Sequence, residues 1–414
     1  MTKMKESGID WIGQIPQEWE VTRIKNIVSI ERGASPRPID KFISDDGTGV
    51  NWIRIGDTYK GNKYITSTKL KITNRGKQFS RYIHPGTLIL SNSMSFGEPY
   101  ISSIYGCIHD GWLSLAPNNN ISKEYLYWLL LSDVCTSQFN LVSIGAVVEN
   151  LSVDKVGNTL VSMPYSLSEQ QKIADFLDKK TAQLDKVKAL LEEQIQKLKD
   201  YRASLIHETV TKGLDKTVPM KDSGIDWIGQ VPQGWGVSRL KYYFDIYAGG
   251  DIDERNTVEE YSESHPYPVL SNSLENEGVL GYTNKYRFKK NCVTVTGRGD
   301  VGKAVYRNIN FYPVVRLLVC VPKSQVDCRF VTYWINSAII EKNQTAVSQL
   351  TIQMLGELLF VNVPFLVQKN IADFLDKETI QIDKLIQIKN QQIENINKQR
   401  QTLIYDYVTG KRRM

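Results

Sequence analysis

One short segment of the chain matches sequence motifs that bind nucleotides in other proteins. Residues 297–303 read GRGDVGK and follow the β-branched run CVTVT at 292–296. This matches both G-x-G-x-x-G and G-x-x-x-x-G-K, but a P-loop needs Ser or Thr after the lysine, where this chain has Ala304. Both patterns also need a following helix, whose N-terminus binds the phosphate. The next residues, AVYRNINFYPVV, are β-branched and aromatic and include a proline, so we interpret the segment as a turn between strands.

A related turn is predicted in the first half of the chain, at NSMSFGE (92–98), where Gly97 stands opposite Gly302. The two turns display different polar side chains, namely Asn92, Ser93 and Glu98 in the first and Arg298 and Lys303 in the second. Arginine pairs bidentately with guanine and asparagine with adenine, so both turns are candidate base readers. A purely structural hairpin is the alternative.

Basic side chains gather in two stretches, each of which contains a single acid. Residues 54–81 have eight basic residues against Asp57, and residues 285–316 have eight against Asp300. Tyr, Asn, Thr and Ser are interleaved with them, which favours contacts with nucleic-acid phosphates over an ordinary solvated face. The net charge of +6 and the pI near 8.8 agree with this interpretation but are too mild to carry it alone.

Residues for catalysis and metal binding form no recognisable arrangement in the sequence. The four histidines lack metal-ligand spacing, and the chain lacks H-E-x-x-H, G-x-S-x-G and the N-P-P-Y or D-P-P-Y motif of amino-methyltransferases. Five cysteines without a C-x-x-C pair argue against disulfides and structural zinc and fit a reducing compartment. No apolar run reaches the length of a membrane span and the N-terminus has no apolar h-region, so we expect a cytoplasmic protein.

The sequence blocks that we expect to position the candidate residues each occur twice in the chain. Residues 4–25 and 220–241 share 16 of 22 positions, and residues 173–186 and 371–384 share 11 of 14. The order is therefore A-x-B-A-y-B, in which the x and y segments between the repeated blocks are dissimilar. Constant blocks around divergent inserts indicate one scaffold that carries two different recognition modules.

The B blocks predict long helices. Ser168 and Gln171 form a capping-box pattern at the start of the first, which continues without Pro or Gly to Gly213, roughly 68 Å of helix. Apolar residues recur every seven positions, at Leu177, Leu184, Leu191, Leu198, Leu205, Leu375, Ile382, Ile396 and Leu403, and Lys389 interrupts the stripe. The residues predicted to widen the stripe are Ile173, Val187, Ile195, Ile371, Leu385 and Ile393. We expect the two helices to form an antiparallel coiled coil with a pseudo-two-fold axis, and a helix that lies on its own domain is the alternative.

The x and y segments contain short β-branched or aromatic runs bounded by Gly, Asn and Pro, and each has a late helical stretch. Tyr127–Trp128 and Tyr333–Trp334 are predicted to occupy matching places in these stretches and to pack in the cores. The fold class is therefore predicted to be α/β (α+β), with strand-rich segments at 1–165 and 214–365 and helices at 166–213 and 366–414.

This plan resembles the specificity subunit of type I restriction–modification systems, the HsdS family. The repeated blocks carry the resemblance through SGIDWIGQIPQEW (7–19), its copy at 223–235, EQQKIADFLDKKTAQLD (169–185) and its copy at 370–383. The inserts carry it through ERGASPRP (31–38), VNWIRIGDTYKGNKYI (50–65), PGTLILSNSMSFGE (85–98), YPVLSNSLENEGVLGYTNKYRF (267–288) and VTVTGRGDVGKAVY (293–306). Glu98 departs from the family pattern, in which lysine is common.

The resemblance implies two target-recognition domains joined by two long antiparallel coiled-coil helices. Each domain would read one half of a split, asymmetric site on double-stranded DNA, with half-sites on the order of 34–36 Å apart. The helices would dock two methyltransferase (M) subunits, and restriction–translocase (R) subunits would join. S-adenosylmethionine, ATP and Mg are expected on those partners, with no cofactor and no catalytic residue in this chain.

The residues expected to contact DNA come from the basic stretches, the turns and the recognition patterns. They are Arg32, Ser35, Arg54, Lys60, Lys63, Lys69, Lys71, Arg75, Asn92, Ser93, Asn272, Lys285, Arg287, Arg298, Lys303 and Arg307. Two other hypotheses remain open: a self-contained DNA-processing enzyme with an unrecognised active site, and an architectural coiled-coil protein that ignores DNA sequence.

Overall fold

The computed structural model describes residues 3–9, 11–44, 47–93, 96–143, 150–338 and 349–413 and divides into two compact units. Unit 1 comprises Met1–Leu191 with Gln391–Met414, and unit 2 comprises Glu192–Asn390. Two long helices, α6 (Leu167–Lys212) and α9 (Phe365–Val408), each contribute residues to both units. Met94 and Ser95 of the first predicted turn lie outside the described residues.

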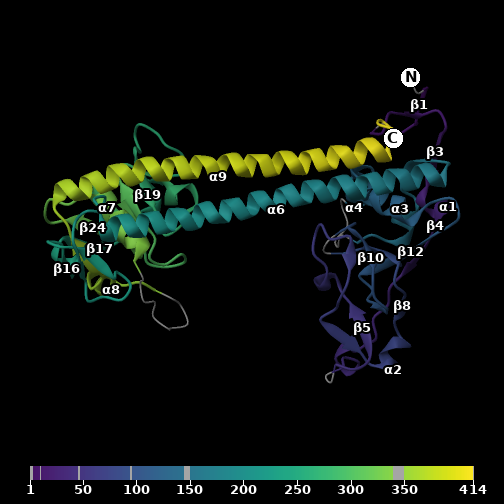
Figure 1. Cartoon of the computed structure of the whole chain (residues 1–414), viewed down its shortest axis with the longest axis horizontal. Helices are drawn as coiled ribbons and strands as arrows, with labels where there is room; N and C mark the ends of the chain where they lie inside the picture. The colour runs from purple at the N-terminus through teal and green to yellow at the C-terminus, as the bar shows by residue number, and fades with distance from the viewer. Residues whose placement is uncertain are drawn as a thin grey trace. The chain divides into compact units, whose positions relative to one another are not determined.

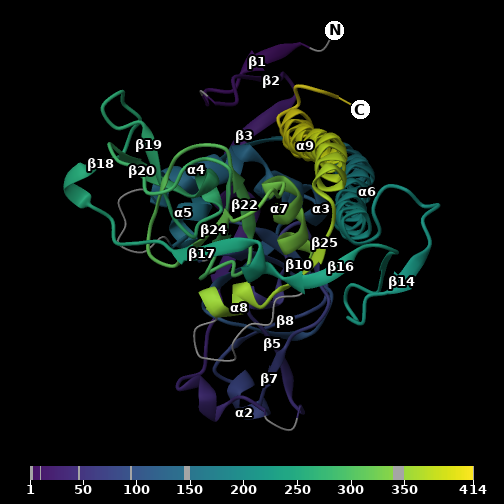
Figure 2. The ribbon, with the colours of Figure 1, turned by 90° about the vertical axis from the view of Figure 1, so that its left-hand side faces the viewer.

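Unit 1 combines two larger sheets with short helices. One sheet has the order β4 (Val28–Arg32), β12 (Trp112–Pro117), β9 (Leu88–Ser91), β10 (Pro99–Ser102), β6 (Tyr64–Ile65), and the other β7 (Leu70–Ile72), β5 (Val50–Ile53), β11 (Gly106–Ile108), β8 (Arg81–Ile83). The strand pairs are β1 (Met4–Glu6) with β2 (Gln14–Pro16) and β3 (Trp19–Arg23) with β13 (Leu160–Pro164). The helices are α1 (Ile24–Ile27), α2 (Asn74–Lys77), α3 (Lys123–Leu131), α4 (Asp133–Ser143) and α5 (Val153–Gly157). Figure 1 labels α1, α2, α3 and α4, and Figure 2 labels α5.

Unit 2 repeats this plan with one strand fewer in one of its larger sheets. One sheet has the order β17 (Phe244–Ala248), β24 (Leu317–Pro322), β21 (Cys292–Thr296), β22 (Ala304–Arg307), and the other β18 (Thr257–Val258), β20 (Val279–Thr283), β19 (Tyr267–Leu270), β23 (Tyr312–Pro313). The strand pairs are β14 (Met220–Asp222) with β15 (Gln230–Pro232) and β16 (Gly236–Arg239) with β25 (Leu359–Asn362). Helices α7 (Cys328–Ser337) and α8 (Ile352–Gly356) complete it, and α7 lies beside α6 and α9 in Figure 2.

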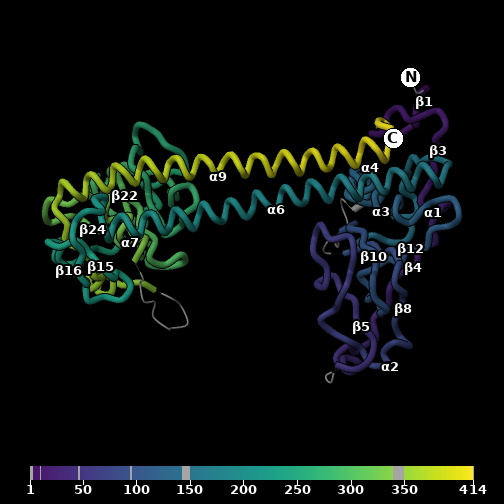
Figure 3. The backbone as a smooth tube through the Cα atoms, viewed as in Figure 1, coloured from purple at the N-terminus to yellow at the C-terminus, as the bar shows by residue number. Residues whose placement is uncertain are grey.

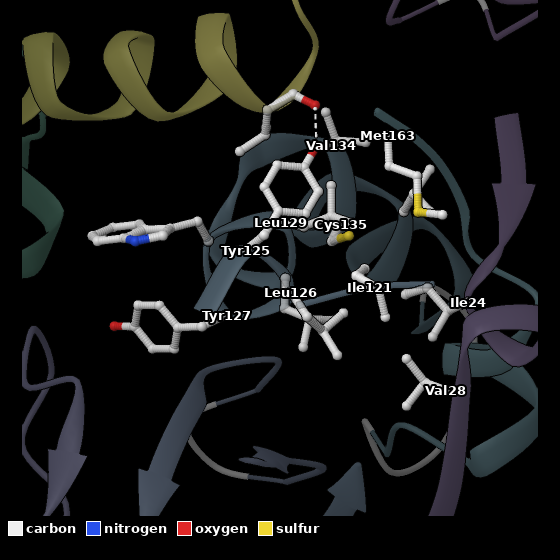
Figure 4. Packing of buried hydrophobic residues seen from close by; sticks show 14 of the residues in the cluster. Ile24, Val28, Ile121, Tyr125, Leu126, Tyr127, Leu129, Val134, Cys135 and Met163 are labelled. Atoms are coloured by element: carbon white, nitrogen blue, oxygen red, sulfur yellow. Dashed lines mark hydrogen bonds between the residues drawn. The ribbon is translucent and has the colours of Figure 1, made fainter. Parts of the chain in front are cut away.

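Both cores include apolar residues from both long helices. In unit 1, Leu177 of α6 and Ile404 of α9 belong to the same buried cluster as Tyr125 and Leu129 of α3. The Tyr125 hydroxyl donates a hydrogen bond of 3.2 Å to the carbonyl of Val408, which is the dashed line in Figure 4. In unit 2, an equivalent cluster joins α7 to both helices through Ile206, Val210, Ile371 and Leu375. The mixed fold predicted from the sequence is confirmed.

The helices pair antiparallel within each unit. In unit 1, Asp185 is 3.6 Å from Arg400, and the Phe176 ring centroid is 4.5 Å from that of Tyr407. As the residue number falls along α6, the number of the partner residue on α9 rises, which defines antiparallel pairing. Unit 2 has the same pattern, with Arg202 3.3 Å from Asp383 and with Lys389 donating a hydrogen bond to Gln194. The predicted antiparallel arrangement is therefore confirmed in both units.

The apolar stripe of the helices is narrower than predicted. Leu177 and Leu375 are fully buried, and Ile382 is nearly so. The other predicted seam residues, Leu184, Leu191, Leu198, Leu205, Ile396 and Leu403, are half-buried. Ile173, Ile195 and Ile371 are buried, as the predicted widening requires. Val187 and Leu385 are each 47% exposed, so the prediction that they widen the seam is wrong. Two paired helices cover only one stripe of each other, and the additional neighbours needed for full burial come from the recognition segments near the helix ends.

The start of α6 differs from the predicted capping box by two residues. The backbone N–H of Glu169 donates to the Ser166 hydroxyl at 3.4 Å, and that of Gln170 donates to the Ser166 carbonyl at 3.0 Å. Ser166 therefore occupies the capping position and Ser168 lies inside the first turn. The predicted end at Gly213 agrees with a left-handed φ of 74° there, which favours glycine.

The aromatic pairs of the recognition segments match with a shift of one residue from the prediction. Counted from the cap residue of each helix, Trp128 in α3 corresponds to Tyr333 in α7 rather than to Trp334. Trp128 Nε1 donates to Asp178 at 2.9 Å, and the Tyr333 hydroxyl donates to Asp376 at 2.8 Å. These aspartates are the same position of the repeated helix block, so the two helices α3 and α7 dock on α6 and α9 through equivalent bonds.

The chain ends meet in unit 1. Tyr405 of α9 donates to the carbonyl of Trp11 at 2.8 Å, and Arg413 forms ion pairs with Glu18 and Glu169. Figure 3 shows the C-terminus beside the strands of the N-terminal segment. In the part of the chain that is described, no helix is long and apolar enough to cross a membrane.

Replacing Leu375 by Ala should lower the free energy of unfolding by about 2–5 kcal/mol, because the substitution leaves a cavity in a buried helix contact. Leu385→Ala is the matched control on the same helix and should change it by less than about 0.5 kcal/mol. Urea unfolding of the full chain, followed by circular dichroism, measures both variants. Equal shifts for the two leucines would contradict the burial pattern described above.

Candidate nucleic-acid interface

The two predicted turns are hairpin loops. Strand β9 pairs antiparallel with β10, and β21 pairs antiparallel with β22, so residues 92–98 and 297–303 each connect neighbouring strands. A strand follows each loop, and no helix N-terminus is available there to hold a phosphate. The interpretation of GRGDVGK as a turn rather than a nucleotide-binding loop is confirmed.

The same backbone bonds hold both loops. The Ser91 hydroxyl accepts from the N–H of Glu98 at 3.0 Å, and the Thr296 hydroxyl accepts from the N–H of Lys303 at 2.9 Å. The N–H of the glycine that both loops share donates to the carbonyl of that same Ser or Thr, at 2.9 and 2.8 Å. Both glycines have a left-handed φ, 76° for Gly97 and 85° for Gly302. The loop ends are therefore fixed while the side chains between them differ.

The two loops differ in charge where they meet solvent. Arg298 and Lys303 are exposed in unit 2. In unit 1 the residue that corresponds to Lys303 is Glu98, whose carboxylate is 3.7 Å from Lys60. The loop of unit 2 thus presents cations, whereas the loop of unit 1 ends on an acid that pairs with Lys60, a cation of another segment.

Asn92 and Asn272 hold neighbouring loops in place. Asn92 is 1% exposed, and its side-chain amide donates to the carbonyl of Asp110 at 2.9 Å. Asn272 is half-buried, and its amide donates to the carbonyl of Val315 at 3.1 Å. These carbonyls lie in equivalent loops, just before β12 and β24. Both side-chain amides already donate to backbone carbonyls of the chain, so their placement gives no support to the prediction that they read bases.

Asp110 connects three of the segments that the sequence singled out. Ser35 donates to one carboxylate oxygen at 2.6 Å, and Arg37 approaches the other at 3.2 Å. Arg32 Nε donates to the Asp110 carbonyl at 3.0 Å, beside the bond from Asn92. The hydrogen bond from Ser35 is the largest cause that lowers the pKa of Asp110, so its carboxylate stays charged.

Sequence reasoning did not select Asp110 or Arg37 for this site. The available signal was weak: Arg37 lies inside ERGASPRP, between two prolines, and Asp110 follows a histidine that has no counterpart in the second half. More than 70 residues separate Asp110 from Ser35, so no local pattern could join them.

Two predicted DNA contacts are internal. Lys63 has a side chain 13% exposed and binds the Asp178 carboxylate at 2.6 Å, which ties it to α6. Arg307 is 6% exposed, and its guanidinium donates to the Thr294 hydroxyl at 2.9 Å and to the Glu277 carbonyl at 3.0 Å. Both cations hold elements of the fold together, and a DNA phosphate has no open surface of Arg307 to meet. A run of basic residues shows the residue types but not which of them turn inward.

The remaining predicted residues stay on or near the surface. Those that are exposed are Arg32, Lys60, Lys69, Arg75, Lys285, Arg287, Arg298 and Lys303. Those that are half-buried are Ser35, Arg54, Lys71 and Ser93. Their role in DNA contact stays a prediction, and the exposed cations are the ones placed to meet phosphates.

Among the described residues, no group of three or more His, Cys, Asp or Glu side chains is arranged to hold a metal ion. The cysteines are buried, and burial raises the pKa of Cys292 to about 11 and that of Cys328 to about 12. A thiol with so high a pKa is a poor nucleophile at neutral pH. The geometry of this surface suits the binding of an extended anionic ligand.

The fold and this interface define a chain with two recognition units that share a frame and differ in their loops. The family described as "Type I restriction modification DNA specificity domain" matches residues 16–199 and 232–398. Because the match covers most of the sequence and occurs twice, the chain belongs to this family.

Individual relatives agree with this assignment. The putative type I specificity subunit S.MpnORF89P of Mycoplasma pneumoniae is 36% identical over 118 residues, which cover 28% of this chain and 35% of that protein. The putative type I restriction enzyme MjaX specificity subunit of Methanocaldococcus jannaschii is 26% identical over 434 residues, which cover 97% of this chain and 96% of that protein. The first match thus spans about a third of its relative, and the second spans nearly all of it.

A solved structure shares the fold over nearly the whole length. It comes from work described as the structural basis of complex assembly and conformational transition of the type I R-M system. Its chain has a TM-score of 0.78 and 16% identity, with 96% of this chain and 99% of that chain covered. Since the identity is low, this likeness shows the fold alone.

Arg307→Ala should destabilise the chain by about 1–3 kcal/mol, because it leaves the buried hydroxyl of Thr294 without its donor. Arg298→Ala, in the hairpin loop that precedes the same strand, should leave the free energy of unfolding within about 0.5 kcal/mol. Chemical denaturation of both variants gives the comparison. A stable Arg307→Ala protein with weakened DNA binding would return Arg307 to the interface.

Proposed function

We propose that this chain is the DNA sequence-recognition subunit of a type I restriction–modification complex and reads a bipartite, asymmetric site on double-stranded DNA. The observation that carries the proposal is the repeated hairpin. Thr296 and Ser91 fix the same loop backbone in two units, and the two loops carry different side chains. One frame with two sets of side chains suits a ligand that presents two different half-sites.

The chain is proposed to be non-catalytic. Specificity subunits recognise DNA, and chemistry falls to methyltransferase and restriction subunits, which carry S-adenosylmethionine, ATP and Mg. The absence of known catalytic motifs from the sequence supports this division. The purified chain alone should neither methylate nor cleave DNA, and turnover by the chain alone would favour the self-contained enzyme instead.

Exchange of one insert tests the recognition role. The segment from Val28 to Asn158 lies between β3 and β13, so a relative's equivalent segment can replace it while the β3–β13 pair is kept. Sequencing of methylated DNA from the host should show one half-site changed and the other retained. A change in both half-sites, or in neither, would reject a modular reader.

Arg298→Ala should relax the choice at one base pair of the half-site read by unit 2, at a cost of about 1–3 kcal/mol, because an arginine pairs bidentately with guanine. Binding to a library of DNA duplexes at fixed salt measures the preference at every position. An even loss across all sequences would make Arg298 a phosphate contact instead.

The long helices carry a duplicated apolar surface suited to two copies of one partner. Val187 and Leu190 of α6 are 47% and 49% exposed in unit 1, and Leu385 and Ile388 of α9 are 47% and 46% exposed in unit 2. The two pairs occupy the same positions of the repeated helix block. We assign each pair to one methyltransferase subunit, because equal surfaces on a duplicated scaffold bind equal partners. Restriction subunits would then join this core complex.

Leu190→Glu and Ile388→Glu should each remove one methyltransferase subunit, and the double variant should remove both, because a charge is placed in an apolar contact. Tyr201→Glu is the matched control, since Tyr201 is 56% exposed on α6 but its repeat position holds Gln399. Mass photometry of the reconstituted complex counts the subunits. Retention of both partners by the double variant would reject this docking surface.

A further inference from the structure

Asp110 of unit 1 is a half-buried loop residue whose backbone and side chain are both fixed by hydrogen bonds. Its backbone N–H donates to Ser35 Oγ at 3.3 Å, while the same hydroxyl donates to its carboxylate at 2.6 Å. Its carbonyl accepts from Arg32 and from the buried Asn92 amide. The carboxylate therefore points in one direction, set by β4, the loop that follows β4 and the β9–β10 hairpin.

Arg37 is the outermost member of this group. Its side chain is 82% exposed, and its Nη2 is 3.2 Å from the Asp110 oxygen that Ser35 does not use. Arg37 stands between Pro36 and Pro38, whose rings fix the backbone φ angle on either side. The backbone around Arg37 and one edge of its guanidinium are thus both restrained.

An ion pair this exposed contributes little to stability, since solvent screens it and the arginine loses rotamer freedom. What the pair does provide is orientation of the guanidinium. Pairing with guanine requires two parallel N–H groups aimed at the O6 and N7 atoms of the base. A carboxylate that holds one edge of the guanidinium leaves other N–H groups free and reduces the entropy lost on binding.

An open surface depression of about 640 Å³ is lined in part by Arg37 in unit 1. Its walls include Pro36, Pro38, Ile39, Trp52, Arg54 and His109, so it is largely apolar with a cationic rim. Trp52 is nearly fully buried and His109 is largely so, which makes the floor rigid. The apolar walls suit the face or methyl group of a neighbouring base, and the rim suits the phosphates that flank it.

Unit 2 has no carboxylate at the position that corresponds to Asp110. The N–H of Gly33 donates to the carbonyl of Trp112, and the N–H of Gly249 donates to the carbonyl of Leu317, both at 2.8 Å, so the starts of β12 and β24 correspond. Two residues before these strand starts, valine (Val315) occupies in unit 2 the position of the aspartate. Any base read through Asp110 must belong to the half-site of unit 1.

We propose that Arg37 reads a guanine in the half-site of unit 1 and that Asp110 is the positioning residue that orients it. The proposal rests on the proposed function and deepens it, because it names one base and the side-chain pair that selects it. Arg37 touches the base edge. Asp110 acts through Arg37 and contacts no base itself.

The test measures base preference with the full-length chain in complex with its methyltransferase subunits, on a library of DNA duplexes at several salt concentrations. Arg37→Ala should lower discrimination at a single guanine by about tenfold to a hundredfold and leave the salt slope unchanged. Arg37→Lys keeps the charge but loses the planar fork, so it should restore little of that discrimination. Asp110→Asn should weaken the preference at the same base pair by a smaller factor.

Arg75→Ala is the matched control from an exposed cation of α2 in the same unit. As a phosphate contact, Arg75 should weaken binding to all sequences evenly and reduce the salt slope by about 1. An even loss in Arg37→Ala that Arg37→Lys rescues would overturn the proposal in favour of a phosphate contact. Unchanged preference in Arg37→Ala would overturn it in favour of a surface ion pair.

These results are separable from the fate of the proposed function. If the unmodified complex prefers no DNA sequence, the proposed function itself fails. If it prefers a site and Arg37→Ala keeps the full preference, only this inference fails. Should Asp110→Asn disturb folding in a thermal denaturation control, the Arg37→Ala and Arg37→Lys pair still decides the question, because Arg37 is exposed and makes no buried contact through its charge.

Discussion

Each of the two cores is closed by a helix segment from the other half of the sequence, and the rest of the structure depends on this exchange. Ile404 and Val408, at the end of the second repeat, are buried in the core of unit 1. Ile206 and Val210, at the end of the first repeat, are buried in the core of unit 2. Since each core needs residues from both repeats, the two halves of the chain must be stabilised together.

The hydrogen bonds between the long helices and the inserts have the same arrangement in both units. The repeated helix block supplies the acceptor, an aspartate at the same position in both copies, and the insert supplies the donors. Asp178 accepts from Trp128 and Lys63, whereas Asp376 accepts from Tyr333 and Arg329. A buried glutamine near the start of each helix likewise caps the insert's late helix, through Gln170 in one unit and Gln368 in the other. The inserts can therefore diverge while their docking stays the same.

The sequence was sufficient to predict what repeats and what has a period. The duplicated blocks, the long antiparallel helices and the turn at 297–303 all follow from local patterns. Burial is a property of the folded neighbourhood, so the sequence did not show that Arg307 turns inward or that Val187 and Leu385 face solvent. It also missed the pairing of Asp110 with Arg37, which brings together residues far apart in the chain.

The hairpin loops have a consequence for how such a protein changes over time. Their shape depends on a side-chain hydroxyl before the loop, which accepts from a backbone N–H, and on a glycine near the loop end, whose N–H donates to a backbone carbonyl. Some side chains between these points are exposed, such as Arg298, whereas Asn92 is buried. Substitutions at the exposed positions cost little stability, so new recognition properties are open to single mutations. Because the two loops are separate, drift in one leaves the other intact, and a lineage can explore half of its specificity at a time.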